Sequence, residues 1–194
     1  TKNPTKIIMS RIKQLSKDSI IYGLGGGLVK GFSFFLLPIY TSIFSPSDYG
    51  KIEMIVVITS FLSAILIIGM DSAQSFYFYG EKNKKGKSIL ITSILIWRIT
   101  WGVIMVVIAT ILSPVLNQFF FDDTLSWKYF GIAFSGALFY QILNQSLEVL
   151  RLLYKAWSFV LVSLLHTILS ATIILILIFL FDKGILGYFL GTLF

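Results

Sequence analysis

The chain lacks cysteine altogether and is poor in charged residues. The absence of cysteine excludes disulfide bonds, thiolate metal sites and cysteine catalysis. Only 13% of the 194 residues are charged, against about 25% in soluble domains, whereas 56% are hydrophobic. This composition indicates an integral membrane protein. The net charge of +7 forms no basic stripe on a soluble face, so we do not expect nucleic acid as a partner.

Long apolar runs follow one another along the chain, and five of them are long enough to cross a bilayer as helices. They predict an all-α fold, a polytopic membrane helix bundle with five complete transmembrane helices and the start of a sixth. The predicted spans are residues 18–44, 52–76, 88–112, 129–150, 157–181 and the incomplete 185–194. Because the chain begins with Thr1 and stops inside an apolar run, we expect it to be the front part of a longer protein.

A basic leader, residues 1–17, precedes the first span. Ile8, Ile12 and Leu15 have the spacing of an amphipathic helix lying on the membrane surface, although an ordinary basic leader fits equally well.

Lysine and arginine are distributed unevenly between the predicted loops. If the N-terminus is cytoplasmic, that side carries eleven of them: Lys2, Lys6, Arg11, Lys13, Lys17, Lys82, Lys84, Lys85, Lys87, Arg151 and Lys155. The opposite side carries three: Lys51, Lys128 and Lys183. Because cytoplasmic loops collect basic residues, we expect a multi-pass protein with its N-terminus in the cytoplasm.

The first span contains a lysine near the bilayer midplane. Lys30 lies about 18 Å along the helix from its polar start, where a cation costs at least a few kcal/mol in lipid. We therefore expect Lys30 to face protein or water. Gly23, Gly27 and Gly31 recur on a neighbouring face and predict the close approach of another helix.

Two other spans carry potentially cationic residues at a similar depth, Arg98 in the third and His166 in the fifth. Together with Lys30 they predict a basic central cavity for an anionic ligand such as a phosphate or pyrophosphate group. The alternative is internal pairing, in which Lys30 or Arg98 neutralises Asp71 or Glu148. His166 can equally serve a helix-to-helix hydrogen bond.

The fourth span carries a polar stripe on one helical face, because its members have offsets of 0, 3, 4 and 7: Gln141, Asn144, Gln145 and Glu148. We expect the stripe to line water or to form an interhelical hydrogen-bond seam. Arg151 extends it toward the cytoplasmic mouth. Asp71, in the second span, is expected to pair with a basic residue or to take up a coupling proton or cation, and His166 is a second candidate for such ion coupling or pairing.

Signatures of catalysis are missing. The chain has no HExxH, GxSxG or phosphate-loop motif, and the adjacent Asp122 and Asp123 are more typical of a solvated loop than of a metal pair. We expect no cofactor, no metal and no enzymatic activity.

The order of several short motifs resembles the bacterial polysaccharide (O-antigen and capsule repeat-unit) flippases, a branch of the multidrug/oligosaccharidyl-lipid/polysaccharide exporter superfamily. The motifs are Lys30 with Pro38, Ser45-Pro-Ser-Asp-Tyr-Gly50, Gly69-Met-Asp-Ser-Ala73, Leu150-Arg151 with Lys155-Ala156, and Gly184-Ile-Leu-Gly187 with Gly191. Only their order and spacing make the resemblance specific, and it covers essentially the whole chain.

The resemblance implies two six-helix lobes around a central cavity, with residues 18–194 forming most of the N-terminal lobe. It implies transport of an oligosaccharide on undecaprenyl pyrophosphate from the inner to the outer leaflet of the bacterial cytoplasmic membrane, for O-antigen, capsule or exopolysaccharide synthesis. Implied partners are this lipid-linked oligosaccharide, membrane lipid, and the polysaccharide polymerase with its chain-length machinery. By position, Lys30 and Arg98 would be cavity cations and Arg151 would lie at the cytoplasmic mouth.

Three alternatives remain. A multidrug exporter of the same superfamily would favour acidic residues in its cavity, because its cargo is cationic. A membrane scaffold subunit without cargo predicts that Lys30 and Arg98 are paired and dry. A membrane-embedded transferase would need catalytic residues in loops longer than those of this chain.

Overall fold

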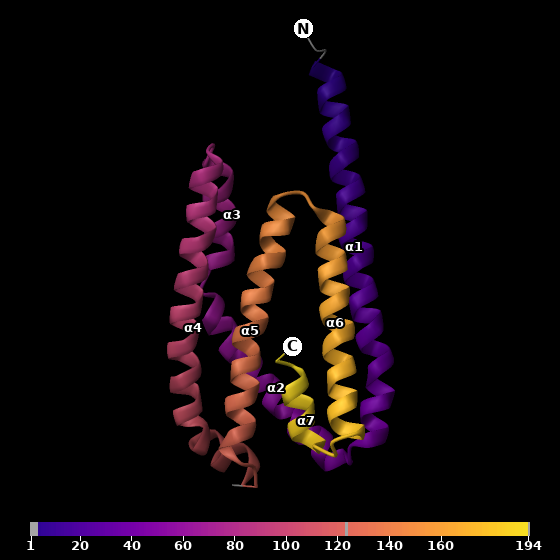
Figure 1. Cartoon of the computed structure of the whole chain (residues 1–194), viewed down its shortest axis with the longest axis vertical. Helices are drawn as coiled ribbons and strands as arrows, with labels where there is room; N and C mark the ends of the chain where they lie inside the picture. Colours follow the sequence, from indigo (N-terminus) through magenta and orange to yellow (C-terminus); the bar gives the residue numbers. More distant parts are fainter. Residues whose placement is uncertain (1–3, 123, 194) are drawn as a thin grey trace.

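The computed structural model describes the backbone of residues 4–122 and 124–193, and the side chains from Ser16 onward within those ranges. These residues form seven α-helices and no strand (Figure 1). The helices are α1 (Pro4–Ile43), α2 (Pro46–Ile67), α3 (Met70–Gly80), α4 (Lys84–Phe121), α5 (Trp127–Leu152), α6 (Ala156–Phe179) and α7 (Gly184–Gly191). The predicted all-α fold is confirmed.

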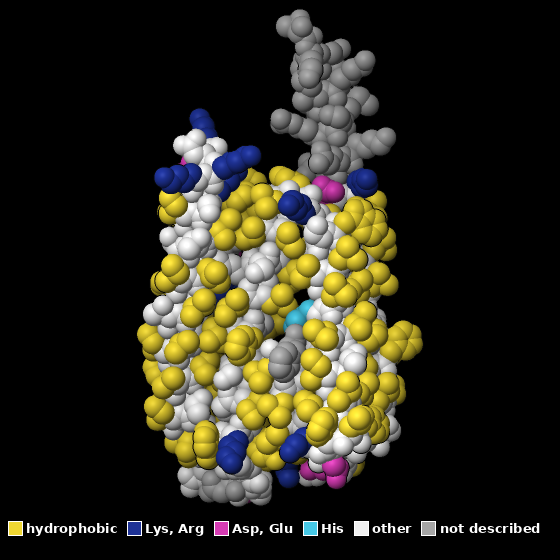
Figure 2. All heavy atoms as spheres, viewed as in Figure 1, with side chains coloured by type: hydrophobic (Ala, Val, Ile, Leu, Met, Phe, Trp, Pro, Cys, Tyr) yellow, Lys and Arg dark blue, Asp and Glu magenta, His cyan; other side chains and the backbone are white. Residues whose placement is uncertain are grey.

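Four segments are both long and apolar enough to cross a membrane: Ser16–Ile43, Pro46–Gly80, Lys84–Phe121 and Ala156–Phe179. Helix α5 has 26 residues and is also long enough, at about 1.5 Å per residue, but its polar stripe makes it less apolar. Figure 2 shows hydrophobic side chains over most of the middle of the molecule and charged side chains gathered at its two ends. The structure is that of a polytopic membrane bundle.

Helix α5 lies at the centre of the bundle. Figure 1 shows α1 beside α6 at one edge, α4 with α3 at the opposite edge, and the short α7 near the end at which α6 turns back. The largest buried cluster of apolar side chains joins α2, α4, α5, α6 and α7, with Phe130 and Phe134 of α5 almost fully buried in it. Ring contacts lie inside this cluster, because the ring centroid of Phe130 is 5.7 Å from that of Phe121 and 6.1 Å from that of Phe134.

Helix α2 begins earlier than the predicted span because its sequence contains a helix-start signal. Ser45 is the N-cap, and its side-chain oxygen accepts a hydrogen bond of 3.1 Å from the backbone N–H of Asp48. Pro46 occupies the first turn, where its missing N–H has no cost. The Ser-Pro-Ser-Asp motif is therefore the cap of α2.

The candidate span Pro46–Gly80, which contains the predicted span 52–76, is interrupted between α2 and α3. Ile68 and Gly69 both have positive φ, 37° and 69°. Such left-handed residues end a helix, and Gly69 adopts this conformation without a Cβ penalty. The uninterrupted apolar run conceals the break, because hydropathy carries no information on backbone dihedrals.

No break separates the predicted leader from the first span. Helix α1 is continuous from Pro4 to Ile43, and Figure 1 shows its N-terminal part extending past the other helices. The apolar face predicted for the leader, Ile8, Ile12 and Leu15, lies outside the described side chains, as do Asp123 and the end of the sixth run at Phe194.

Within the described part of the chain, the glycines predicted to admit a neighbouring helix are not the ones that do so. A Cβ built on Gly23, Gly27 or Gly31 meets no atom within 4 Å. A Cβ on Gly25 would overlap the side chain of Val160, at the α1–α6 contact. The close approach of α1 to α6 therefore depends on Gly25, which lies on the opposite side of the helix from the predicted stripe.

Candidate functional site

Arg98 lies at the centre of a buried polar cluster between α3, α4 and α5. Its side chain is 1% exposed, and its Nη2 forms an ion pair of 2.6 Å with Asp71 Oδ1. Its Nη1 donates to the backbone oxygen of Gln141 at 3.2 Å and to Gln141 Oε1 at 3.3 Å. The structure thus has the pairing arrangement that the sequence left open for Arg98 and Asp71.

The predicted polar stripe of α5 faces this cluster. Gln141 and Gln145 are 3% and 2% exposed. Gln141 donates to Ser63 of α2, and Gln145 donates to the backbone oxygen of Ile91 in α4 at 3.2 Å. Asn144 is half-buried beside them. These contacts form an interhelical hydrogen-bond seam, the second of the two predicted arrangements.

A second ion pair ends the seam at the N-terminal side of the bundle. Arg151 Nη2 lies 2.6 Å from Glu148 Oε2, and Ser75 of α3 donates to Glu148 Oε1 at 3.2 Å. Arg151 itself is exposed. Glu148 therefore connects α3 to α5, and Arg151 lies at the end of the bundle where α5 turns into α6.

Lys30 lies apart from this cluster. It is exposed, and among the described residues it has no carboxylate within 4 Å. At 1.5 Å per residue it is about 20 Å from either end of the candidate span Ser16–Ile43. Because α1 and α4 lie at opposite edges of the bundle, Lys30 and Arg98 are not brought to one site within the described chain (Figure 1).

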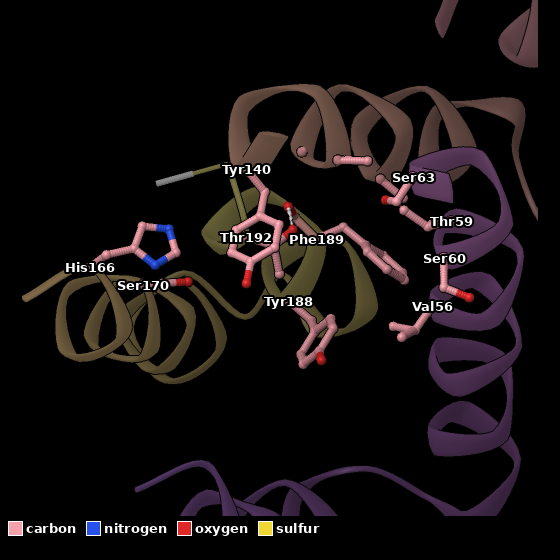
Figure 3. A pocket seen from close by; sticks show the side chains of 13 residues that line it. Val56, Thr59, Ser60, Ser63, Tyr140, His166, Ser170, Tyr188, Phe189 and Thr192 are labelled. Atoms are coloured by element: carbon pink, nitrogen blue, oxygen red, sulfur yellow. Dashed lines mark hydrogen bonds between the residues drawn. The ribbon is translucent and has the colours of Figure 1, made fainter. Parts of the chain in front are cut away.

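His166 lies in a cavity of about 350 Å³ between α2, α5, α6 and α7. Figure 3 shows His166 and Ser170 on one side, Thr59, Ser60 and Ser63 on the opposite side, and α7 between them. Tyr140 completes the group, its ring centroid 6.0 Å from that of His166. The cavity thus combines one imidazole with several hydroxyl groups at membrane depth.

Several buried polar atoms at these sites have no hydrogen-bond partner among the described residues, and Arg98 Nε and Gln145 Oε1 are two of them. Gln74 is fully buried between α3 and its neighbours, and neither atom of its side-chain amide is hydrogen-bonded. Thr59 Oγ1, in the wall of the His166 cavity, is likewise buried and unpaired. Unsatisfied buried groups are costly, so both positions favour a further polar partner.

A family model described as "Polysaccharide biosynthesis protein" matches residues 15–194. The chain belongs to this family. No curated protein and no solved structure matches it.

In this polysaccharide biosynthesis protein, the site residues predicted from the sequence fall into two groups. Arg98, Asp71 and three members of the stripe come together as an internal seam, with Arg151 at its end. Lys30 and His166 stand apart from the seam, on an open face of α1 and in the α6 cavity respectively. The family member therefore holds two kinds of polar group: paired ones inside the helix contacts, and unpaired ones at exposed or hollow positions.

The hydroxyl groups of the cavity and the buried Gln74 were missed in the sequence. Thr59, Ser60 and Ser63 recur with helical spacing on the second span, which is a signal that could have identified the cavity wall. Gln74 gave no such signal, because its burial depends on the turn at Gly69 that redirects α3.

Proposed function

We propose that this polysaccharide biosynthesis protein acts as a flippase. Its cargo would be oligosaccharide repeat units on undecaprenyl pyrophosphate, moved from the inner to the outer leaflet by alternating access. In this proposal Lys30 binds the anionic pyrophosphate, while the hydroxyl-lined cavity at His166 offers hydrogen bonds to sugar hydroxyls.

The observation that carries the proposal is the exposed, unpaired Lys30 in the middle of a membrane-spanning helix. Its ammonium group is too far from either end of the span to reach the headgroup region, and a cation in hydrocarbon is costly. Water, an anionic cargo or another polar segment must therefore surround it. A pyrophosphate passing through such a space supplies the missing negative charge.

Arg98 has a different role in this proposal from the one its position in the sequence suggested. Its guanidinium is occupied by Asp71 and Gln141 and is closed to solvent, so we assign it to holding α3 and α5 on α4. A cargo-free scaffold would have Lys30 as well as Arg98 paired and dry, and the exposure of Lys30 argues against that class. The mid-depth cation also disfavours a multidrug exporter of cationic compounds.

The proposed orientation and location rest on the distribution of basic residues between the two ends of the bundle. The N-terminus, the α3–α4 turn and the α5–α6 turn share one end of the bundle, and the predicted basic loops are on these segments (Figure 1). We place this end in the cytoplasm of a bacterium, in its cytoplasmic membrane. The polysaccharide polymerase and the chain-length machinery would then act on the cargo after its release on the opposite side.

The experiment is surface glycan display in cells from which the gene has been deleted, complemented by wild type, Lys30→Gln or Lys30→Arg at matched membrane levels. Lys30→Gln should reduce display at least tenfold, with lipid-linked oligosaccharide accumulating in the inner leaflet. Lys30→Arg keeps the charge and should retain most of the display.

Lys51→Gln is the control, because Lys51 is a lysine at the far end of the bundle with a carboxylate neighbour, Asp48, at 4.0 Å. Normal display with Lys30→Gln at normal protein level would refute the role of Lys30. Normal glycan export after deletion of the gene would refute the flippase itself.

A further inference from the structure

A cavity of about 330 Å³ lies between the beginning of the first span and the α5–α6 turn. Its wall includes Lys17 and Asp18 of α1, and Tyr154, Lys155, Trp157 and Ser158 around the start of α6. The first span is predicted to begin here, at residue 18, and the candidate span of α6 begins here at Ala156. In a membrane the cavity therefore lies at the level of the lipid headgroups.

The charged groups of this cavity form no ion pair within the described part of the chain. Among the described residues, neither Lys17 nor Lys155 has a carboxylate within 4 Å, and both are exposed. Asp18 Oδ2 is buried and has no hydrogen-bond partner in the described chain. The cavity therefore offers two cationic hydrogen-bond donors, the ammonium groups of the lysines, and one negatively charged acceptor, the carboxylate oxygen of Asp18.

This arrangement has the polarity of a zwitterion. Two lysines suit a phosphodiester, and the positive end of the α6 dipole adds to their field. A buried, unpaired carboxylate oxygen suits an ammonium group, which can donate a charge-assisted hydrogen bond. Trp157, which is 63% exposed at the same level, is of the residue type that anchors proteins among headgroups.

We propose that this cavity binds the headgroup of an aminophospholipid, with its phosphate on Lys17 and Lys155 and its ammonium group on Asp18. The site lies where the first span meets the α5–α6 turn, next to the end of the seam at Arg151, and does not depend on the proposed transport. Basic pockets between membrane helices on the cytoplasmic side are a known mode of headgroup recognition. Here the carboxylate would add selectivity for a headgroup that carries a donor.

The test is native mass spectrometry of the full protein titrated with phosphatidylethanolamine, phosphatidylcholine or phosphatidylglycerol. Phosphatidylcholine has the same charge as phosphatidylethanolamine but no N–H donor, so we expect the wild type to bind it about tenfold more weakly. Asp18→Asn should abolish this difference by weakening phosphatidylethanolamine alone. Lys17→Gln and Lys155→Gln should each weaken both lipids about fivefold.

Lys128→Gln is the matched control, since Lys128 also adjoins an exposed tryptophan, Trp127, but at the other end of the bundle. It should bind all three lipids as the wild type does. Equal binding of phosphatidylethanolamine and phosphatidylcholine, or an equal loss in Lys128→Gln, would overturn the proposal. Tighter binding of phosphatidylglycerol, insensitive to Asp18→Asn, would replace it with an anionic lipid. Displacement by millimolar inorganic phosphate would show that free phosphate is the ligand.

Discussion

The two partners of the Arg98–Asp71 ion pair are buried to different extents. The side chain of Arg98 is 1% exposed, whereas that of Asp71 is 42% exposed. Removal of Asp71 leaves a guanidinium enclosed in the protein interior, but removal of Arg98 leaves a carboxylate that the protein does not enclose. The energetic consequences of the two substitutions are therefore unequal.

We expect Asp71→Ala to destabilise the protein by about 3–5 kcal/mol and Arg98→Met by about 1–2 kcal/mol. Thermal unfolding of the purified protein in detergent would show this as a larger drop of the midpoint for Asp71→Ala. The double variant should recover part of the loss, because it removes both charges. A greater loss in Arg98→Met would mean that the hydrogen bonds to Gln141, rather than the ion pair, dominate.

The sequence predicted which residues are polar at membrane depth, but not what each one touches. Offsets of 3 and 4 put Gln141 and Gln145 on one face of α5, and this is confirmed. The choice between a cavity and a seam depends on which helix lies opposite that face. Helical periodicity contains no such information, so the choice of Asp71 as the partner of Arg98, and the contact of Gln141 with Ser63, were found only in the structure.

At the level of helices, α1 is held on α6 by the contact between Gly25 and Val160. We expect Gly25→Ala to lower the thermal midpoint, because the added methyl group overlaps Val160 and overpacking costs about 1–3 kcal/mol. Val160→Ala in the same protein should restore it. Gly27→Ala is the control: its Cβ meets open space, so helix propensity alone should raise stability by about 0.5–1 kcal/mol. Equal effects of the two alanines would contradict the observed contact.

A glycine-to-alanine substitution is expected to lower stability at Gly69, in the break between α2 and α3. Gly69 also has open space around a built Cβ, but its φ is +69°. Gly69→Ala should therefore destabilise by about 1–2 kcal/mol through backbone strain alone. Thermal unfolding measures this as well. A midpoint raised as in Gly27→Ala would indicate that α2 and α3 form one continuous helix in solution.

Across the described molecule, some polar side chains at membrane depth are bonded to a neighbouring helix, and others have no such bond and can interact with a ligand. The Arg98 seam belongs to the first kind. Lys30, the His166 cavity and the Lys17–Asp18 cavity belong to the second, and they lie on α1 or on the α6 side of the bundle. This division explains why depth in the span, the criterion available from the sequence, grouped Lys30 with Arg98 although their surroundings differ.

The division predicts a pattern of water access that can be measured directly, since the chain contains no cysteine to interfere. Single substitutions Lys30→Cys, Gln145→Cys and Lys85→Cys would be exposed to a membrane-impermeant thiol reagent, in whole cells and in inside-out vesicles. Lys85→Cys, in the first turn of α4, should react only in inside-out vesicles if the N-terminus is cytoplasmic. Gln145→Cys should be protected in both, because that side chain is 2% exposed in the seam.

Lys30→Cys decides between a polar path and a lipid-facing position. Reaction of Lys30→Cys from at least one side, at a rate at least tenfold above Gln145→Cys, is expected if water reaches the middle of α1. Added lipid-linked oligosaccharide should slow that reaction, because cargo and reagent would compete for the same space. Protection of Lys30→Cys equal to that of Gln145→Cys would mean that lipid or another protein segment, and not water, surrounds position 30, and the proposed path would then have to lie elsewhere.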